Sequence, residues 1–387
     1  MIALHAERVL TAHGPEPDCW VTVDSGVIAA IGGAPLLDAT QVELGHADLI
    51  PGLVDLHSDC LEHLAHPRPN AELPLASALL ELDALAISHG ITTHLLCINL
   101  EDDAVKHRSE ARARETMSVL QRLDGHLRSD HRVHLRVDVT ADWVDLAVEM
   151  VGSGWVRLLS YMDHTPGQGQ YRDEEVWRDA YSKITHDSSD LIEHRLHMKR
   201  SGQAGAGRIR EQLGQLARAA GVRLASHDDD GPESVARAHA LGAAISEFPV
   251  SAEAASAAWS AGIAVVMGAP NARRGSSHLT NLSAREALQG GWLDALASDY
   301  HPPSLLAAAY GLSGSQDCTW ADAVALVSAG PARAGGYRDR GAIAPGMRAD
   351  LVAVELRGGH PVVLQTWVAG RPGLGGPTAV GAKASLT

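Results

Sequence analysis

The residues of this sequence that are best suited to chemistry are histidines and carboxylates that directly follow short apolar runs. The run at residues 53–56 ends in His57-Ser58-Asp59, and side chains two positions apart leave a strand on the same face. Imidazole nitrogens and carboxylate oxygens are ligands of divalent ions such as zinc. Later runs end in further potential ligands, and these are His164, His227, Glu247 and Asp299.

Each of these residues also has a purely structural explanation. His227 could be a core histidine, and Glu247 could pair with an arginine. Asp229 and Asp230 are predicted to cap the helix that follows them. The structural explanation fails for the whole set, because so many charges in one place need a counter-ion. We therefore expect one or two divalent ions, with zinc as the first choice and manganese, iron or magnesium as alternatives.

A metal ion among these residues favours hydrolysis as the reaction class. A divalent ion polarises a substrate oxygen and lowers the pKa of a bound water to about 7. Asp299 follows the last run and is expected to orient or deprotonate that water, and His227 is the second predicted catalytic residue. No Gly-rich dinucleotide loop and no serine or cysteine nucleophile motif competes with this assignment.

The spacing of these residues requires alternating strands and helices. Helical patterns at residues 76–88, 110–123 and 233–241 lie between apolar runs. Eight such units predict an α/β fold, a (β/α)8 barrel of the TIM type, whose sites lie at the carboxyl ends of the strands. An open doubly wound sheet is the alternative, but it does not explain polar residues at nearly every strand end. After the opening strand, the predicted strands are 92–98, 133–139, 156–162, 223–227, 244–248, 264–268 and 295–299.

The two chain ends differ from the middle. Val21-Thr22-Val23 and residues 27–31 flank a hairpin signal, and residues 349–354 and 361–368 have a similar β-like pattern. We predict a small composite β-sandwich from residues 1–48 and 340–375. The barrel is expected at residues 49–339, with a tail at 376–387. A long insertion at residues 166–221 is expected to act as a lid or collar.

Composition and charge exclude several classes of protein. The 387 residues carry a net charge of −15, which argues against nucleic-acid binding and against a membrane surface. The four cysteines are far apart, and neither a signal peptide nor an apolar run of membrane-spanning length is present. We therefore expect a soluble cytoplasmic protein, with a homo-oligomer left open. Most of the histidines are expected at the surface, for example His126, His131 and His134.

The order of these motifs resembles the amidohydrolase superfamily. The similarity rests on residues 51–57, the eight units, Asp299 and the closing segment 341–352. Longer blocks resemble a narrower group, the diphosphatases that act on α-D-ribose 1-methylphosphonate 5-triphosphate in the carbon–phosphorus lyase pathway. These blocks are residues 57–62, 67–69, 162–168, 225–229, 247–249, 267–271, 274–278 and 298–300.

The sequence departs from these patterns at two places. Most amidohydrolases have His-x-His on the first strand and a Lys or Glu on the fourth, whereas this chain has His-x-Asp and the pair Asp163-His164. The diphosphatase group shares that change. Cys60 and His63 stand where the first motif of the group has Asn and Lys, so substrate affinity or choice could differ.

The resemblance implies a small anionic substrate that is hydrolysed to a 5-phosphate and pyrophosphate in phosphonate catabolism. Its phosphates need cationic side chains and backbone donors. Two alternatives remain: a C–N hydrolase acting on a cyclic amide or an N-acyl amino acid, and a non-catalytic barrel that serves as a scaffold. The predicted substrate-binding residues are Arg68, Gln168, Gln170, Arg172, Asn271, Arg274 and His278.

Overall fold

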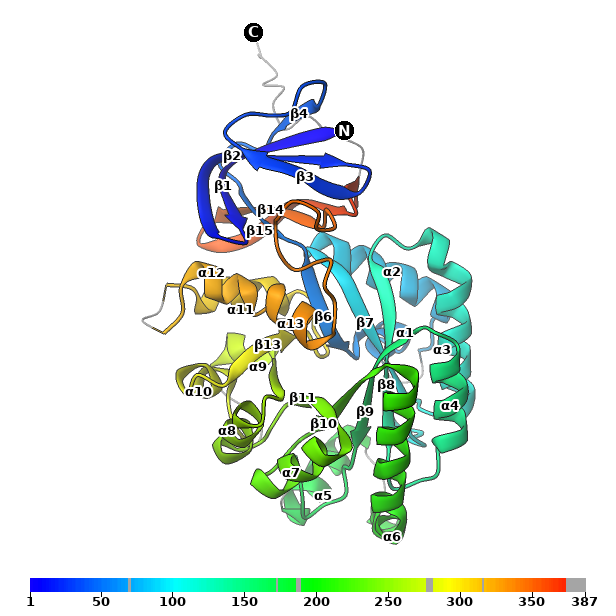
Figure 1. Cartoon of the computed structure of the whole chain (residues 1–387). Coiled ribbons are helices and arrows are strands. Elements are labelled where there is room, and N and C mark those ends of the chain that lie inside the picture. The colour runs from blue at the N-terminus through cyan, green and yellow to red at the C-terminus, as the bar shows by residue number, and fades with distance from the viewer. Residues whose placement is uncertain (69–70, 172, 186–188, 276–280, 315–316, 374–387) are drawn as a thin grey trace.

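Eight runs of mainly small and branched aliphatic residues form a parallel sheet in which strands adjacent in the sequence are adjacent in space. Such runs suit strands that are covered on both faces. Ser58 at the end of the first strand forms a bridge with Asp299, so the sheet nearly closes into the predicted barrel (Figure 1). The strands are β6 (Leu53–Ser58), β7 (Ile91–Leu100), β8 (Asp130–Asp138), β9 (Val156–Met162), β10 (Arg223–His227), β11 (Ala243–Glu247), β12 (Ala264–Gly268) and β13 (Leu293–Ala297).

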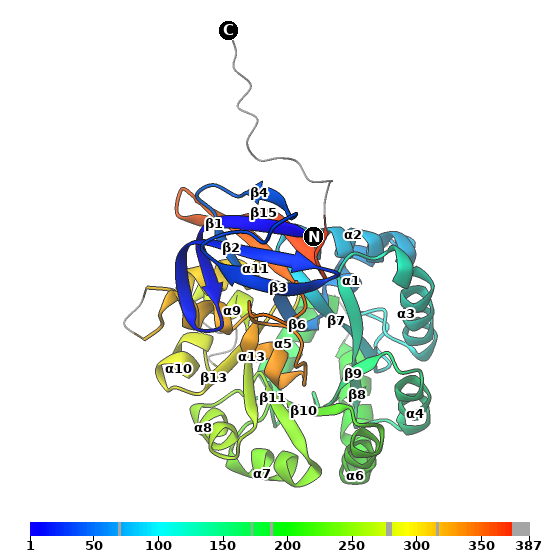
Figure 2. The same ribbon diagram turned by 45° about the horizontal axis from the view of Figure 1, so that its top comes forward.

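The helices that connect these strands lie around the outside of the barrel (Figure 2). The three helical patterns predicted from the sequence agree with α2, α3 and α7 to within one residue at each end. The helices are α1 (Cys60–Ala65), α2 (Leu75–Ser88), α3 (Glu110–Leu123), the 3-10 helix η1 (Asp124–His126), α4 (Val144–Gly152), α5 (Glu174–Thr185), α6 (Ser189–Ala220), α7 (Pro232–Leu241), α8 (Ala252–Ser260), α9 (Ala269–Arg274), α10 (Ala284–Gln289), α11 (Ser304–Leu312), α12 (Trp320–Ala325) and α13 (Ala329–Ala334).

The computed structural model describes residues 1–68, 71–171, 173–185, 189–275, 281–314 and 317–373. The tail predicted at residues 376–387 lies outside the described residues, and the predicted limits of the two larger regions stay predictions. Within the described ranges, no helix is both long enough and apolar enough to cross a membrane.

Strands from both chain ends form a second sheet at one end of the barrel (Figure 1). The strand β5 joins the two ends, because it pairs in parallel with β1 and antiparallel with β14. The predicted hairpin corresponds to β2–β3. The two β-like segments predicted near the C-terminus correspond to β14 and β15, which pair antiparallel. The strands of this sheet are β1 (Ile2–Thr11), β2 (Gly14–Asp24), β3 (Val27–Gly32), β4 (Thr40–Glu43), β5 (Asp48–Pro51), β14 (Leu351–Arg357), β15 (His360–Val368) and β16 (Arg371–Pro372).

Gly52 separates the terminal sheet from the barrel. It lies between β5 and β6, and its amide donates to the carbonyl oxygen of Asp350 over 2.8 Å. A Cβ atom at this position would lie 2.3 Å from Oγ1 of Thr92. Only glycine therefore allows the chain to pass between the two sheets at this distance. The strand that follows is β6, which carries His57.

The predicted insertion forms α5 and the 32-residue helix α6. Lys199 of α6 donates to Glu101 Oε1 over 3.0 Å and also to Asp138. The hydroxyl of Tyr181 on α5 donates to Asp103 Oδ2 over 2.9 Å. These contacts hold the insertion against the segments that follow β7 and β8, next to the carboxyl ends of the strands.

Candidate metal centre and substrate pocket

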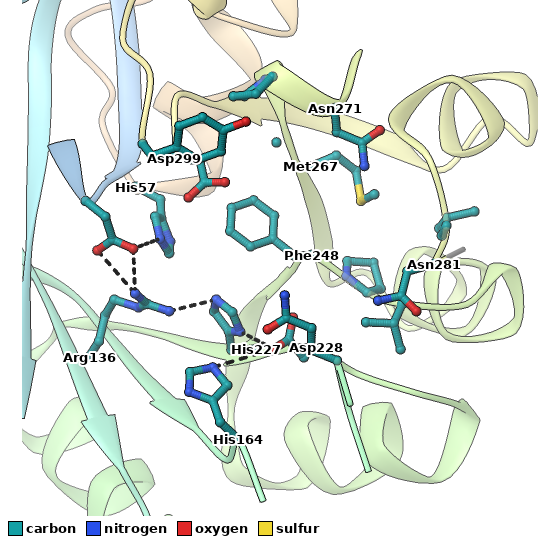
Figure 3. Close-up of a pocket in the computed structure, with 18 of the residues that line it drawn as sticks. His57, Arg136, His164, His227, Asp228, Phe248, Met267, Asn271, Asn281 and Asp299 are labelled. Carbon is teal, nitrogen blue, oxygen red and sulfur yellow. Dashed lines mark hydrogen bonds and ion pairs between the residues drawn. The ribbon is translucent and has the colours of Figure 1, made fainter. Parts of the chain in front are cut away.

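The carboxyl ends of the barrel strands surround a polar pocket (Figure 3). Parallel strands direct the residues at their carboxyl ends toward a common centre. Segments separated by more than two hundred positions in the sequence therefore meet here. Five of the six predicted metal ligands line the pocket, and these are His57, Asp59, His164, His227 and Asp299.

His57, Asp59 and Asp299 form one compact group of potential ligands. Nε2 of His57 lies 3.6 Å from Oδ2 of Asp59, and ligand atoms of all three residues lie within 4.8 Å of one another. Asp59 follows β6 directly and precedes α1. Asp299 lies two residues beyond the end of β13, whereas the sequence predicted that this strand extends to residue 299.

Glu247 lies deeper than the other predicted ligands and does not line the pocket. It is fully buried, and its Oε1 lies 3.2 Å from Nδ1 of His57. A carboxylate only accepts hydrogen bonds, so Nδ1 carries the proton and Nε2 of His57 faces Asp59. Burial would raise the pKa of Glu247, but the neighbouring imidazoles of His134 and His57 lower it to about 2. Glu247 is therefore placed behind His57 and orients its ring.

His134 is a part of this group that the sequence analysis assigned to the surface. It is fully buried on β8, and its Nδ1 donates to the carbonyl oxygen of Leu56 over 3.0 Å. Its Nε2 lies 3.4 Å from Oε2 of Glu247. Burial lowers the pKa of His134 to about 3, so the ring is neutral. The same expectation was wrong for His131, which is buried next to Asp83.

His164 and His227 both lie next to Asp228 (Figure 3). Oδ2 of Asp228 lies 3.0 Å from Nδ1 of His227 and 3.7 Å from Nε2 of His164. Burial lowers the pKa of His164 to about 3, which keeps this ring neutral. These three residues form a second group with ligand atoms within 4.8 Å of one another. Asp228 was not among the ligands predicted from the sequence.

The two carboxylates next to Asp228 do not share one role. Asp229 was predicted to cap a helix, but it is buried and accepts hydrogen bonds from Ser226 and Ser246 over 2.5 and 2.6 Å. Asp230 lies beside the start of α7, and its Oδ2 accepts a hydrogen bond from the amide of Gly169 over 3.3 Å. The prediction that Asp229 caps a helix was wrong. A capping aspartate and a buried aspartate at the end of a strand have the same local sequence pattern.

Three residues of the pocket adopt a backbone conformation that side chains disfavour. Asp228, Phe248 and Asp299 have φ values of 57°, 53° and 57°. Asp228 and Phe248 directly follow β10 and β11, and Asp299 lies two residues beyond the end of β13. Such strain persists where the surrounding structure enforces it, and it is concentrated at functional sites. Phe248 is the only phenylalanine of the chain, and its ring centroid lies 4.9 Å from that of His57.

Arg136 on β8 contributes a buried positive charge that the sequence analysis missed. Its Nη1 donates to Oδ2 and Oδ1 of Asp59 over 3.0 and 3.2 Å, and to Oδ1 of Asn99 over 3.2 Å. Its Nη2 donates to Nε2 of His227 over 2.9 Å (Figure 3). Arg136 occupies an inward-facing strand position, so no motif around it distinguishes it from a structural arginine.

Two further cations reach the pocket from the segment after β7. Arg108 is buried and donates to both carboxylate oxygens of Glu62 over 2.8 Å and to Glu101 over 2.9 Å. Its charge is therefore balanced within the protein. Lys106 also lines the pocket, and no carboxylate within the described part of the chain forms an ion pair with it. Neither residue was predicted from the sequence as part of the site.

The predicted substrate-binding residues divide into three groups. Gln170, Asn271 and Arg274 line the pocket. Arg68 is exposed and Gln168 is half-buried, and neither is among the residues that line it. A substrate-binding role for these two residues stays a prediction from the sequence. The remaining two predicted residues, Arg172 and His278, lie outside the described residues.

Cys60 and His63, the two residues at which this chain departs from the diphosphatase pattern, do not form part of the wall of this pocket. Cys60 is buried at the start of α1, and His63 is exposed on the same helix. Neither residue is among those that line the pocket.

The donor set fits a divalent ion. It combines imidazole nitrogens with carboxylate oxygens, which are ligands for zinc and manganese. Oδ2 of Asp228 and Oε2 of Glu247 are buried and receive no hydrogen bond from the described residues. Burial raises the pKa of Asp299, although the nearby His57 and Arg136 act in the opposite direction. Negative charge that is incompletely satisfied at the end of a barrel is stabilised by a cation.

Known proteins resemble this chain in sequence and in fold. Residues 89–372 match the model of a family described as "Amidohydrolase family". The chain is 36% identical over 329 residues to the alpha-D-ribose 1-methylphosphonate 5-triphosphate diphosphatase of Escherichia coli (strain K12). That match covers 84% of this chain and 87% of the relative.

Solved structures of more distant proteins share the fold. N-acetyl-D-glucosamine-6-phosphate deacetylase from Mycobacterium smegmatis superimposes with a TM-score of 0.63 at 17% identity, covering 96% of this chain and 99% of that one. N-isopropylammelide isopropylaminohydrolase from Burkholderia multivorans ATCC 17616 gives a TM-score of 0.64 at 18% identity, covering 96% and 98%. At these identities the likeness concerns the fold alone.

Proposed function

This chain belongs to the amidohydrolase family, and from that premise we propose that it hydrolyses α-D-ribose 1-methylphosphonate 5-triphosphate, or a close ribosyl phosphonate triphosphate, to the 5-phosphate and pyrophosphate. The observation that carries this proposal is one pocket that contains both a set of metal ligands and cations for a polyanion. The His57–Asp59–Asp299 group lies in the same pocket as Lys106 and Arg274. The identity to the diphosphatase supports the choice of substrate.

His57, Asp59 and Asp299 would hold the divalent ion, because their ligand atoms already lie close together. The ion would supply Lewis-acid chemistry, which makes water a nucleophile at neutral pH and polarises a phosphoryl oxygen. Glu247 acts as a positioning residue that fixes the ring of His57. His164 and His227, which the sequence also predicted as ligands, both lie close to Asp228.

Asp299 is proposed to accept a proton from the attacking water at a carboxylate oxygen. Burial raises the pKa of Asp299 above its ordinary value, which strengthens the carboxylate as a base. The same group is held at the junction between the first and last barrel strands. A fixed base of this kind costs little reorganisation during the reaction.

The cations of the pocket would bind the phosphate chain. Lys106 is best placed for this role, since no described carboxylate forms an ion pair with it. Arg274 at the end of α9 and the amide of Asn271 reach the same pocket from the segment after β12. Such donors stabilise the charge that develops on the departing pyrophosphate. The C–N hydrolase alternative would not require this concentration of positive charge.

The direct experiment incubates purified protein with the ribosyl phosphonate triphosphate and follows pyrophosphate release. We expect release that stops with a chelator and returns when Mn²⁺ or Zn²⁺ is added back. Parallel reactions with a cyclic amide and an N-acyl amino acid test the C–N alternative. Turnover of those amides without pyrophosphate release would contradict the proposal, and a protein without bound metal or turnover would favour the scaffold. Cytoplasmic location and oligomeric state stay predictions from the sequence.

A further inference from the structure

Arg136 binds two of the predicted metal ligands at once. It is 4% exposed, and its guanidinium lies between Asp59 and His227. One terminal nitrogen donates to the carboxylate of Asp59, and the other donates to Nε2 of His227 over 2.9 Å. The position is built into the sheet, because Arg136 belongs to β8 and pairs in register with Asn99 on β7 and Ser160 on β9.

This contact determines the state of His227. A guanidinium only donates hydrogen bonds and keeps its charge in proteins. Nε2 of His227 must therefore accept, and the proton of the neutral ring lies on Nδ1, 3.0 Å from Oδ2 of Asp228. The single lone pair on Nε2 can either accept a hydrogen bond or coordinate a metal ion. While Arg136 holds it, this nitrogen does not bind a metal ion.

These two groups of potential ligands are therefore not equivalent. The group of His164, His227 and Asp228 is available to an ion only next to the guanidinium, with which the ion would compete for His227. In the group of His57, Asp59 and Asp299, Asp59 alone accepts hydrogen bonds from the guanidinium. Asp59 can serve both cations, because a carboxylate has about four acceptor positions on its two oxygens.

We propose that this centre holds a single divalent ion, bound by His57, Asp59 and Asp299, and that Arg136 supplies the positive charge that a second ion would otherwise supply. The inference rests on the metal-dependent function proposed above. It assigns Arg136 as a positioning residue that directs the lone pair of His227 away from a metal and limits the number of ions. A permanent cation also gives the pocket a site for a substrate phosphate that does not depend on metal supply.

The test is the number of ions per chain. The intact protein is equilibrated with excess Mn²⁺, passed through a desalting column and analysed by mass spectrometry for metal content. We expect one ion per chain in the wild type and two in Arg136→Gln. The substitution frees Nε2 of His227 and removes the repulsion between the guanidinium and a second ion. Arg136→Lys keeps the charge and should hold one ion. Arg132→Gln removes an arginine from the same strand outside the pocket and should also hold one ion.

The outcomes separate this inference from the proposed function. Two ions in the wild type would overturn the inference and leave the function intact, and one ion in both the wild type and Arg136→Gln would also overturn it. No ion in the wild type would remove the metal-dependent function and the inference together. If circular dichroism shows that Arg136→Gln does not fold, the electron paramagnetic resonance spectrum of the Mn²⁺-loaded wild type distinguishes one bound ion from two. A spectrum of isolated Mn²⁺ supports a single ion, and an exchange-coupled pair contradicts it.

Discussion

The backbone amide of Asp299 donates to the carbonyl oxygen of His57 over 2.9 Å, and this hydrogen bond joins the last strand of the barrel to the first. A second hydrogen bond runs from the amide of Asp59 to the carbonyl oxygen of Asp299 over 2.8 Å. The three residues proposed to bind metal are thus connected through the main chain. Barrel closure itself holds the ligands in place, and a rigid element gives a site more precision than a loop does.

Asp299→Asn should leave the fold intact and reduce turnover by about 10²–10⁴-fold, because it removes the proposed base and one anionic ligand. The backbone contacts to His57 and Asp59 do not depend on the side chain and should persist. Pyrophosphate release, with circular dichroism as a check of folding, measures the effect. Asp145→Asn on the exposed face of α4 is the matched control and should retain full activity. Turnover of the Asp299 variant near the wild-type rate would refute the assigned role.

Glu247→Gln should weaken metal binding by about 10–100-fold, since the carboxylate behind His57 raises the basicity of that ligand. The amide oxygen still accepts from Nδ1 of His57, so the ring keeps its orientation. Competition with a chromophoric chelator gives the metal affinity without reference to activity. The control is Glu253→Gln in the first turn of α8, which is exposed. Equal affinities in the Glu247 variant and the wild type would show that Glu247 does not act through His57.

Lys106→Gln should raise KM for the triphosphate substrate by about 10–100-fold, with a smaller change in kcat. The reason is the loss of a charge-assisted hydrogen bond to phosphate, a contact of about 1.5–3 kcal/mol. Steady-state kinetics at constant ionic strength measure both constants. Arg122→Gln on the exposed face of α3 produces the same change in net charge away from the pocket. A rise in KM of the same size in both variants would indicate a general charge effect and not a contact of Lys106.

Asp130→Asn should lower the free energy of unfolding by about 3 kcal/mol at pH 7. Oδ2 of Asp130 accepts from Nη1 of Arg340 over 2.7 Å and from Nη1 of Arg348 over 3.0 Å. Burial would raise the pKa of Asp130, but the hydrogen bond from Arg340 and the charges of Arg132 and Arg348 hold the pKa below its ordinary value. The side chain therefore contributes fully above the unfolded pKa of about 3.9, and the contribution is lost as pH falls through the folded pKa.

Urea unfolding at pH 7, pH 5 and pH 3.5 measures this dependence for the wild type and Asp130→Asn. The difference between them should be constant between pH 7 and pH 5 and begin to narrow at the lowest pH. Asp142→Asn breaks an exposed ion pair with Arg208 and should change the free energy of unfolding by less than about 1 kcal/mol at any pH. A difference for Asp130→Asn that grows on acidification would contradict the direction of the pKa shift.

The sequence alone was sufficient for the barrel and for the end of the barrel at which the site lies. Apolar runs and helical periods are local signals, so β9, β10 and β12 were predicted at their observed bounds. In a parallel barrel all carboxyl ends meet, and this rule gathers His57, Asp59, His227 and Asp299 without knowledge of any distance. The motif order also predicted the family, which the comparisons confirm.

Only the tertiary structure decided which polar residues face the pocket and how deep each one lies. His134 and Arg136 stand within β8, where the local pattern is the same for a buried network and for a solvent-exposed edge. Glu247 was correctly placed at a strand end, but its depth depends on the ring of His57 from another strand. Lys106 and Arg68 both lie in loops, and only the packing of the loops brings the first into the pocket and leaves the second exposed. Contacts between distant segments set these positions, and such contacts leave no local periodicity in the sequence.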